Sequence, residues 1–292
     1  MPSKTHPLAE VFGYPIDNFS EEADRHRTKK LCPFNNKVPN CTKDKANDPL
    51  GTCCISAGDA LAITCPIRFR QDWIIADHSA DFFFPKGAKW TSLTEVRLND
   101  KNGKSAGNID LVLVSYDDHG KVTDFGALEI QAVYISGNVR KPFAYYMEDP
   151  KKNATMSWKN QKHWPGPDYL SSSRKRLAPQ LIFKGGILHT WKKKTAVALD
   201  AGFFKTLPKL TEIAPEKAEI AWLVYDLELD KKKNVYVLKK KKTVYTEFTV
   251  ALNQITKSEA GNVHDFVAVL QEKLDEKLNG IPPDTQTIDQ LL

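Results

Sequence analysis

Two acidic side chains and one amide in the middle of the chain have the types and the spacing of a metal-binding catalytic centre. Glu129 and Gln131 are two positions apart in a strand-like apolar run, so they share one face of that strand. A second such run begins near Asp110, and the polar turn 117–120 joins the two runs into a predicted hairpin. If the chain closes around residues 119–120, opposed residue numbers sum to 239, which places Asp110 across from Glu129.

Two carboxylates that face each other in a sheet repel, and a bound cation would compensate their charge. Directly opposed side chains have Cβ atoms roughly 4.5 to 5.5 Å apart, where like charges destabilise a sheet. Mg²⁺ prefers oxygen ligands and usually takes one or two protein carboxylates. The alternative is structural: Asp110 starts a strand, and Glu129 and Gln131 line a solvated face. The apolar residues around all three argue against a second exposed face.

The cysteines form a second candidate metal site. All five lie within one short stretch, at positions 32, 41, 53, 54 and 65, and no cysteine follows. An odd count in a large chain without a signal-peptide pattern does not suit a disulfide framework. Residues 1–75 are rich in turn residues, so we expect them to bury little apolar surface and to be held by thiolate ligands on a metal. Sulfur ligation fits zinc and iron equally.

The elements that must position these residues belong to an α/β fold. Beyond the hairpin, the pattern predicts strands at 220–229, 234–238 and 243–252. A helix that begins after Asn262 and ends near Gly280 has an apolar stripe, which we expect to pack on the core. The stretch 137–207 has no clean period and is interpreted as mixed helix and loop.

Composition limits the class of protein without naming it. The chain has 292 residues, of which 41% are hydrophobic and 27% charged, with a formal net charge of +6. Short Lys and Arg runs suit a polyanionic partner, although each run alone is explained as well by a solvated surface. The sequence has no apolar run long enough to span a bilayer. We expect a soluble, cytoplasmic protein.

The hairpin and the cysteine segment together resemble a known family. An acid on one strand followed by Glu-x-Lys or a variant is similar to the PD-(D/E)XK nuclease core, here Gly107-Asn108-Ile109-Asp110 and Glu129-Ile130-Gln131. Gln131 stands where Lys is usual. This replacement, with an upstream four-cysteine loop, resembles the NotI-type restriction endonucleases. The resemblance implies a restriction-endonuclease-like core, a central mixed sheet flanked by helices, with an N-terminal four-cysteine region.

The resemblance also implies roles for individual residues. Asp110 and Glu129 would bind catalytic Mg²⁺, assisted by the Ile130 carbonyl, and Gln131 would orient the attacking water. Glu95 would be an additional acid near the metal, unless it is an ordinary surface glutamate. The cysteine loop would be a structural iron site, with zinc as the alternative. We assign its ligands as Cys32, Cys41, Cys53 and Cys65, and the choice between Cys53 and the adjacent Cys54 stays open.

Double-stranded DNA is the partner that the resemblance implies. A type II restriction endonuclease would cut a palindromic, GC-rich site as a homodimer, leave 5′-phosphate ends, and have a cognate DNA methyltransferase that protects the host. Basic residues would contact phosphates or bases. The candidates are Arg68, Arg70, Arg140, Arg174 and Arg176.

Two other functions remain open at this level. A structure-specific or repair nuclease would cut without sequence preference, and a non-catalytic metal-stabilised DNA-binding protein would not cut at all. We expect residues 1–75 to form the metal-binding region and residues 76–292 the catalytic and DNA-binding domain, packed together as one compact unit.

Overall fold

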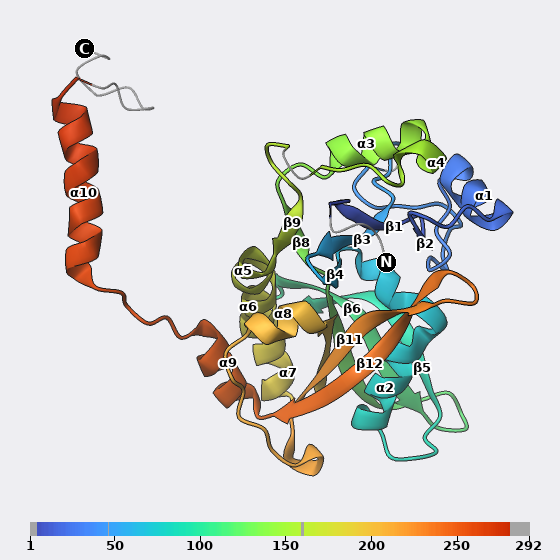
Figure 1. Ribbon diagram of the computed structural model, residues 1–292. Coiled ribbons are helices and arrows are strands. Elements are labelled where there is room, and N and C mark those ends of the chain that lie inside the picture. Colours follow the sequence, from blue (N-terminus) through green and yellow to red (C-terminus); the bar gives the residue numbers. More distant parts are fainter. Residues whose placement is uncertain (1–4, 46, 159–160, 281–292) are drawn as a thin grey trace. The chain divides into compact units, whose positions relative to one another are not determined.

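The chain folds around a six-stranded mixed sheet. The structure is a computed structural model that describes residues 5–45, 47–158 and 161–280 (Figure 1). It divides into two compact units, Met1–Thr256 and Lys257–Leu292, which are considered separately. No described helix is long and apolar enough to cross a membrane.

The large sheet has the strand order β12-β11-β10-β7-β6-β5. Strand β10 runs parallel to both of its neighbours, and the other pairs are antiparallel. The predicted α/β class with a central mixed sheet is therefore confirmed. The strand bounds are β5 Trp90–Asn99, β6 Ser105–Tyr116, β7 Val122–Gln131, β10 Thr195–Asp200, β11 Ile220–Asp230 and β12 Val235–Thr246.

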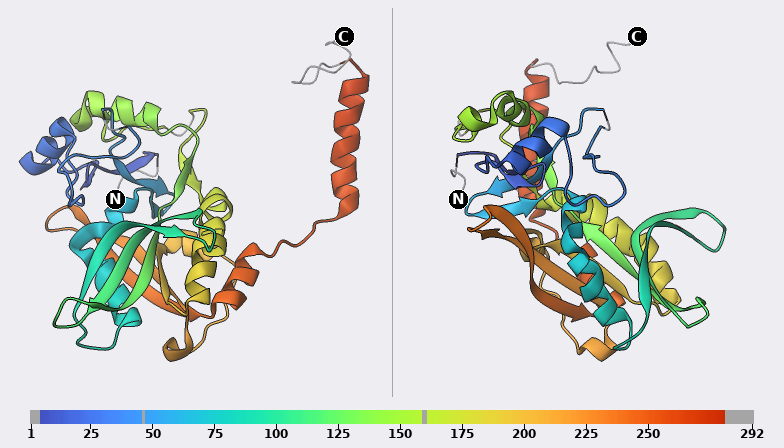
Figure 2. Two further views of the ribbon diagram at one scale, coloured as in Figure 1. Left: turned by 180° about the vertical axis from the view of Figure 1, so that it is seen from behind. Right: turned by 90° about the vertical axis from the view of Figure 1, so that its right-hand side faces the viewer.

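Helices cover both faces of this sheet (Figures 1 and 2). On one face, α2 (Ile74–Phe83) packs its aromatic and aliphatic side chains on residues such as Leu111, Leu128 and Ile130. On the other face lies the helical segment 169–190, which comprises α5 (Tyr169–Ser172), α6 (Ala178–Gln180) and α7 (Gly186–Thr190) joined by two π-helical turns. Burial on both faces explains why all six residues of β10 are buried.

The β6–β7 hairpin has the predicted register. Leu111 pairs with Leu128 and Ser115 with Asp124, so opposed numbers sum to 239 over this stretch. Next to the turn, a register shift between Ser115 and Tyr116 pairs Tyr116 with Val122 instead. Within the turn, the Asp117 carboxylate accepts hydrogen bonds from two backbone N–H groups. The buried face of the alternating strands therefore fixes the register that the turn by itself would shift by one residue.

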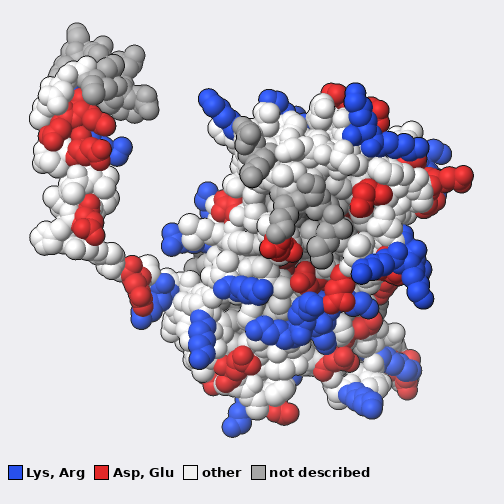
Figure 3. All heavy atoms as spheres, in the orientation of Figure 1, with Lys and Arg blue, Asp and Glu red and all other residues white. Residues whose placement is uncertain are grey.

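The prediction for residues 234–252 was wrong in its division. One strand, β12, spans the whole lysine run, and α9 (Phe248–Thr256) replaces the predicted third strand. Lys239–Lys242 are exposed on β12, the edge strand, where charged side chains prevent pairing with another chain. Figure 3 shows basic side chains over this part of the molecule. Helix α9 forms because Phe248 and Ala251 pack into the core on that face.

The stretch 137–207 contains more regular structure than predicted. It holds α3 (Arg140–Glu148), α4 (Pro150–Asn153), β9 (Gly166–Asp168), the helical segment 169–190, the strand β10 and α8 (Ala201–Thr206). Strand β9 pairs with β8 (Tyr134–Ser136), which lies just before the stretch. The four apolar residues of β10, Ala196–Leu199, are too short a run to distinguish a central strand from a buried helix, so β10 lacked a usable sequence signal.

The N-terminal region forms a second, four-stranded sheet in the order β2-β1-β3-β4. Its strands are β1 Leu8–Val11, β2 Tyr14–Pro15, β3 Thr52–Ala57 and β4 Ala60–Ile63. Leu8, Phe12 and Ile16 are almost fully buried there. The expectation that this region buries little apolar surface was therefore wrong, because its turn residues separate short strands that pack on α3 and α4.

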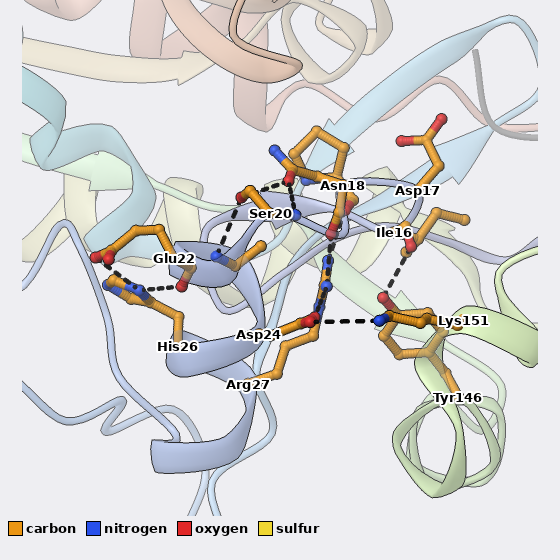
Figure 4. Close-up of polar contacts among 12 residues, drawn as sticks. Ile16, Asp17, Asn18, Ser20, Glu22, Asp24, His26, Arg27, Tyr146 and Lys151 are labelled. Carbon is orange, nitrogen blue, oxygen red and sulfur yellow. Dashed lines mark hydrogen bonds and ion pairs between the residues drawn. The ribbon is translucent and has the colours of Figure 1, made fainter.

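Helix α1 (Glu21–Lys29) is fixed to this sheet by polar contacts (Figure 4). The Ser20 hydroxyl caps the helix by accepting from the Ala23 N–H. The buried Arg27 guanidinium donates to the Pro15 and Asn18 carbonyls and lies 5.7 Å from the centre of the Tyr146 ring. The Tyr146 hydroxyl donates to the Ile16 carbonyl at 2.9 Å, which joins α3 to the same loop.

His6 gives this region a pH dependence. Its ring is fully buried, and burial lowers its pKa to about 4. A depressed histidine pKa stabilises the fold above the unfolded-state value of about 6.5, and this contribution is lost as the pH falls toward 4. We expect the loss to be on the order of 3 kcal/mol. The free energy of unfolding, measured in urea at pH 7, 5.5 and 4, should change less with pH in His6→Asn than in wild type. An equal change in the two proteins would contradict the assignment to His6.

The second unit contains α10 (Val263–Leu278), which begins at the predicted N-cap Asn262. The helix itself is confirmed. Within the described part of its own unit, the apolar stripe Phe266, Leu270, Leu274 and Leu278 is exposed. The expected packing of this stripe on the core stays a prediction.

Candidate active site

Asp110 and Glu129 lie side by side where β6 and β7 meet. They occupy the position next to the Leu111–Leu128 pair in the hairpin register. One Asp110 oxygen, Oδ2, accepts a hydrogen bond from the Ile130 N–H at 2.8 Å. This bond fixes the Asp110 carboxylate against the strand that carries Glu129.

Glu129 is the electrostatically perturbed member of the pair. Its side chain is 6% exposed, and its pKa is raised to about 7. Burial is the largest cause, and the neighbouring Asp110 charge adds to it, whereas the Lys184 ammonium acts in the opposite direction. A buried acid in contact with a second acid is typical of a functional site.

Three polar side chains from the helical segment 169–190 meet the end of β7. Lys184 Nζ lies 2.6 Å from Glu129 Oε2 and donates to the Asn108 carbonyl at 2.8 Å. The Gln131 amide donates to the Gln180 side-chain oxygen. Arg176 donates to the Ile130 carbonyl at 3.3 Å. Lys184 and Gln180 were not predicted, although Arg176, Gln180 and Lys184 follow one another at intervals of four residues, which indicates one helix face.

Two acceptor atoms in this site are left unsatisfied. Glu129 Oε1 and Gln131 Oε1 are buried and have no hydrogen-bond partner among the described residues. A small cavity beside them is lined by the side chains of Gln180, Leu181 and Lys184. Buried acceptors without partners are costly, so their presence suits a bound cation or water.

A magnesium ion fits the residues at this point. Mg²⁺ takes one or two carboxylates and keeps several waters, and the structure offers two adjacent carboxylates with the oxygen Glu129 Oε1 free. The Ile130 carbonyl, the third predicted ligand, already accepts from Arg176.

Glu95 lies apart from this pair. It stands on β5 between Thr94 and Val96, which pair with Leu111 and Ile109, so its backbone is alongside Asp110. Its side chain is 63% exposed, and its carboxylate lies 3.6 Å from Lys37 Nζ. Its φ of 56° is in the left-handed region, which is unusual for a glutamate in a strand.

The cysteines separate into two groups. The pKa of the Cys32 thiol is raised to about 12, mainly by burial and further by Cys65 and Cys41. The pKa of the Cys53 thiol is raised by burial and by neighbours that include Cys65 and Cys32. Cys54 has no cysteine among the causes of its raised pKa and packs in the core under α2. Each of Cys32, Cys41 and Cys53 thus has another assigned thiol among the causes of its raised pKa. Cys54 follows Cys53 on β3, so the two side chains face opposite sides of that strand.

These thiols are nevertheless not arranged as a formed metal centre. All five cysteines are free. Within residues 5–45, 47–158 and 161–280, no group of three or more His, Cys, Asp or Glu side chains could hold a metal ion. The four-cysteine site thus stays a prediction.

The candidate DNA-binding arginines occupy different environments. Arg68 is fully buried and is bound to Glu10, Gln71 and the Tyr236 carbonyl, so it does not face solvent. Arg140 binds Asp44 and Asp48. The others are at least partly exposed: Arg70 lies near the Trp73 ring, and Arg174 and Arg176 are on the helical segment beside the acidic pair.

The mixed sheet, the acidic hairpin and a match to a known family together define the class of protein. The family model described as Restriction endonuclease NotI matches residues 10–238, which include the cysteine segment, the hairpin and the helical segment. The chain is a restriction endonuclease, a type II site-specific deoxyribonuclease and thus a hydrolase that cleaves DNA. It belongs to the NotI family. No curated protein matches the chain.

Proposed function

We propose that this enzyme cuts both strands of a palindromic, GC-rich DNA site in a Mg²⁺-dependent reaction that leaves 5′-phosphate and 3′-hydroxyl ends. The observation that carries the proposal is the buried Glu129 beside the half-buried Asp110, with Glu129 Oε1 unpartnered among the described residues. Asp110 and Glu129 would hold the ion. When bound, Mg²⁺ would activate a water and stabilise charge on the phosphate oxygens.

Gln131 has a separate role in this proposal. Its amide N–H₂ is held by Gln180, which leaves the amide oxygen directed away from that bond and without a partner among the described residues. An amide oxygen accepts hydrogen bonds but does not take up a proton at neutral pH. Gln131 would therefore orient the attacking water without acting as a base. Glu95 would join the site only if its carboxylate left Lys37.

The function is tested by digestion of a bacterial genome with the purified enzyme and Mg²⁺, followed by sequencing of the fragment ends. We expect one recurrent palindrome, cut at a fixed position, with 5′-phosphates that a ligase accepts directly. Ends without a common sequence would favour a structure-specific or repair nuclease. Intact DNA with any divalent ion would favour the non-catalytic DNA-binding protein.

The proposal includes a homodimer, because a two-fold symmetric enzyme presents the same residues to both halves of a palindrome. Arg174, exposed, and Arg176, half-buried, would contact the phosphates near the acidic pair, and Arg70 and Arg140 would contribute more remotely. Arg68 is left out because it is buried. A cognate DNA methyltransferase would protect host DNA.

We also propose that Cys32, Cys41, Cys53 and Cys65 bind one structural iron ion, or zinc in its place. The mutual effects of these thiols on their pKa values support the set. Four thiolates suit either metal.

Cys32→Ser is expected to lose this metal and several degrees of melting temperature together, because binding energy at a structural site is folding energy. Elemental analysis and a thermal melt check this result. Cys54→Ala is the matched control, since Cys54 lies in the core away from the other thiols; it should keep the metal. Wild-type protein without iron or zinc, or equal metal loss in both variants, would contradict the site.

A further inference from the structure

The buried Glu129 carboxylate, which lies beside the half-buried Asp110, needs positive charge, and the strand that carries Glu129 supplies none. Position 131 is a neutral glutamine. The ammonium group that lies next to the two acids belongs to Lys184, on the helical segment 169–190. Lys184 Nζ is 2.6 Å from Glu129 Oε2, and both side chains are only 6% exposed.

The helix and the strand have matching repeats at this point. Arg176, Gln180 and Lys184 are four residues apart, which is about 6 Å along a helix. Their partners Gln131 and Glu129 are two residues apart, which is about 6.6 Å along a strand. Each step along the helix therefore meets the next same-face position of β7, and Lys184 reaches Glu129 when Gln180 reaches Gln131.

The helical segment 169–190 forms π-helical turns at the two places that carry Arg176 and Lys184. Its π-helical turns are Ser173–Leu177, which contains Arg176, and Leu181–Gly185, which contains Lys184. π-turns inside helices are rare and frequently occur at functional sites. The same segment passes close to Phe248, because a Cβ atom on Gly185 would lie 2.8 Å from that ring. The backbone next to Lys184 is thus packed against α9.

We propose that Lys184 is a positioning residue for the catalytic centre, in a role that rests on the proposed function. It binds Glu129 Oε2 and the Asn108 carbonyl, and so clamps β7 to β6 beside Asp110. With Oε2 occupied, the carboxylate presents Oε1 to the cation. Lys184 also compensates the charge of the two acids before the ion binds, which Gln131 is unable to do.

The experiment compares Lys184→Gln with Lys193→Gln. Lys193 is a matched control, because its Nζ also lies 2.6 Å from a β7 carboxylate, that of Asp124 at the far end of the strand. We expect Lys184→Gln to slow single-turnover DNA cleavage at saturating Mg²⁺ by about tenfold to a hundredfold, in line with residues that orient metal ligands. Lys193→Gln should cleave at the wild-type rate.

A second measurement does not depend on cleavage. Without Lys184 the two acids depend on Mg²⁺ alone for compensation, so added Mg²⁺ should raise the melting temperature of Lys184→Gln more than that of wild type or Lys193→Gln. A residue with only a packing role would lower the melting temperature without changing the Mg²⁺ effect. An unchanged Mg²⁺ shift, or a cleavage rate within threefold of wild type, would overturn the proposal.

Two further variants keep the test decisive if Lys184→Gln does not fold. Lys184→Arg retains the charge and should fold and keep part of the activity. The double variant Gln131→Lys with Lys184→Gln returns the ammonium to the strand, and should recover folding and the small wild-type Mg²⁺ shift. Failure of both to differ from Lys184→Gln would contradict the role of the charge. If wild type cuts no DNA, the proposed function fails, while the melting comparison still decides on Lys184.

Discussion

Asp110→Asn is expected to reduce DNA cleavage by on the order of a thousandfold, since it removes one of two carboxylates proposed to hold the catalytic ion. The fold should persist, because the asparagine side-chain oxygen can still accept the Ile130 N–H bond. DNA affinity in Ca²⁺ or without metal should stay close to wild type. Single-turnover cleavage and a gel-shift titration measure the two effects separately.

Asp118→Asn is the control for this prediction. Asp118 is on the same hairpin, at its exposed turn, where its carboxylate contacts Lys89. The same chemical change there should leave cleavage unaltered. Cleavage by Asp110→Asn within tenfold of wild type would remove Asp110 from the catalytic centre, and loss of DNA affinity together with cleavage would indicate a structural role.

Arg68→Met is expected to destabilise the protein by about 3 to 5 kcal/mol, the usual effect of breaking a buried ion pair. Arg68 Nε lies 2.7 Å from Glu10 Oε2, and both side chains are fully buried. The guanidinium also donates to Gln71 and to the Tyr236 carbonyl, so it links the N-terminal sheet to β12. The variant would leave the Glu10 carboxylate buried without a counter-charge.

The effect of Arg68→Met should depend on pH in a defined direction. Burial raises the pKa of Glu10, and Arg68 opposes this rise. Removal of Arg68 therefore raises the pKa further. A carboxyl with a raised pKa in the folded state stabilises the fold in full below its unfolded value of about 4.5, and loses that contribution as the pH rises through the folded value. The deficit of the variant should thus be larger at pH 8 than at pH 5.

Urea unfolding of three proteins checks this prediction. Glu10→Gln combined with Arg68→Met should recover part of the lost free energy, because no buried charge then remains. Arg25→Met removes an arginine that is 55% exposed and pairs with Glu22 on the surface. It should cost less than about 1 kcal/mol. Equal losses for Arg68→Met and Arg25→Met would show that the buried pair does not stabilise the fold.

Much of the central hairpin could be predicted because its information is local. Alternation along each strand fixes which side chains share a face, and the need to bury the apolar face fixes the register. Both features lie within about 25 residues, so no distant segment was needed to place Asp110 beside Glu129. The α9 helix was missed for the opposite reason: Phe248 and Ala251 are helical because the core beside them accepts that face.

The sequence by itself determined the acidic pair, its register, the clustering of the cysteines and the family resemblance, since each rests on residue types at short spacings. Only the tertiary structure decided that Lys184 accompanies Glu129, that Arg68 is buried with Glu10, and that Cys54 packs in the core of the large sheet. These contacts join residues 55 and 58 positions apart, or depend on which side of a strand faces a core. Such contacts follow from packing between elements, which no local pattern encodes.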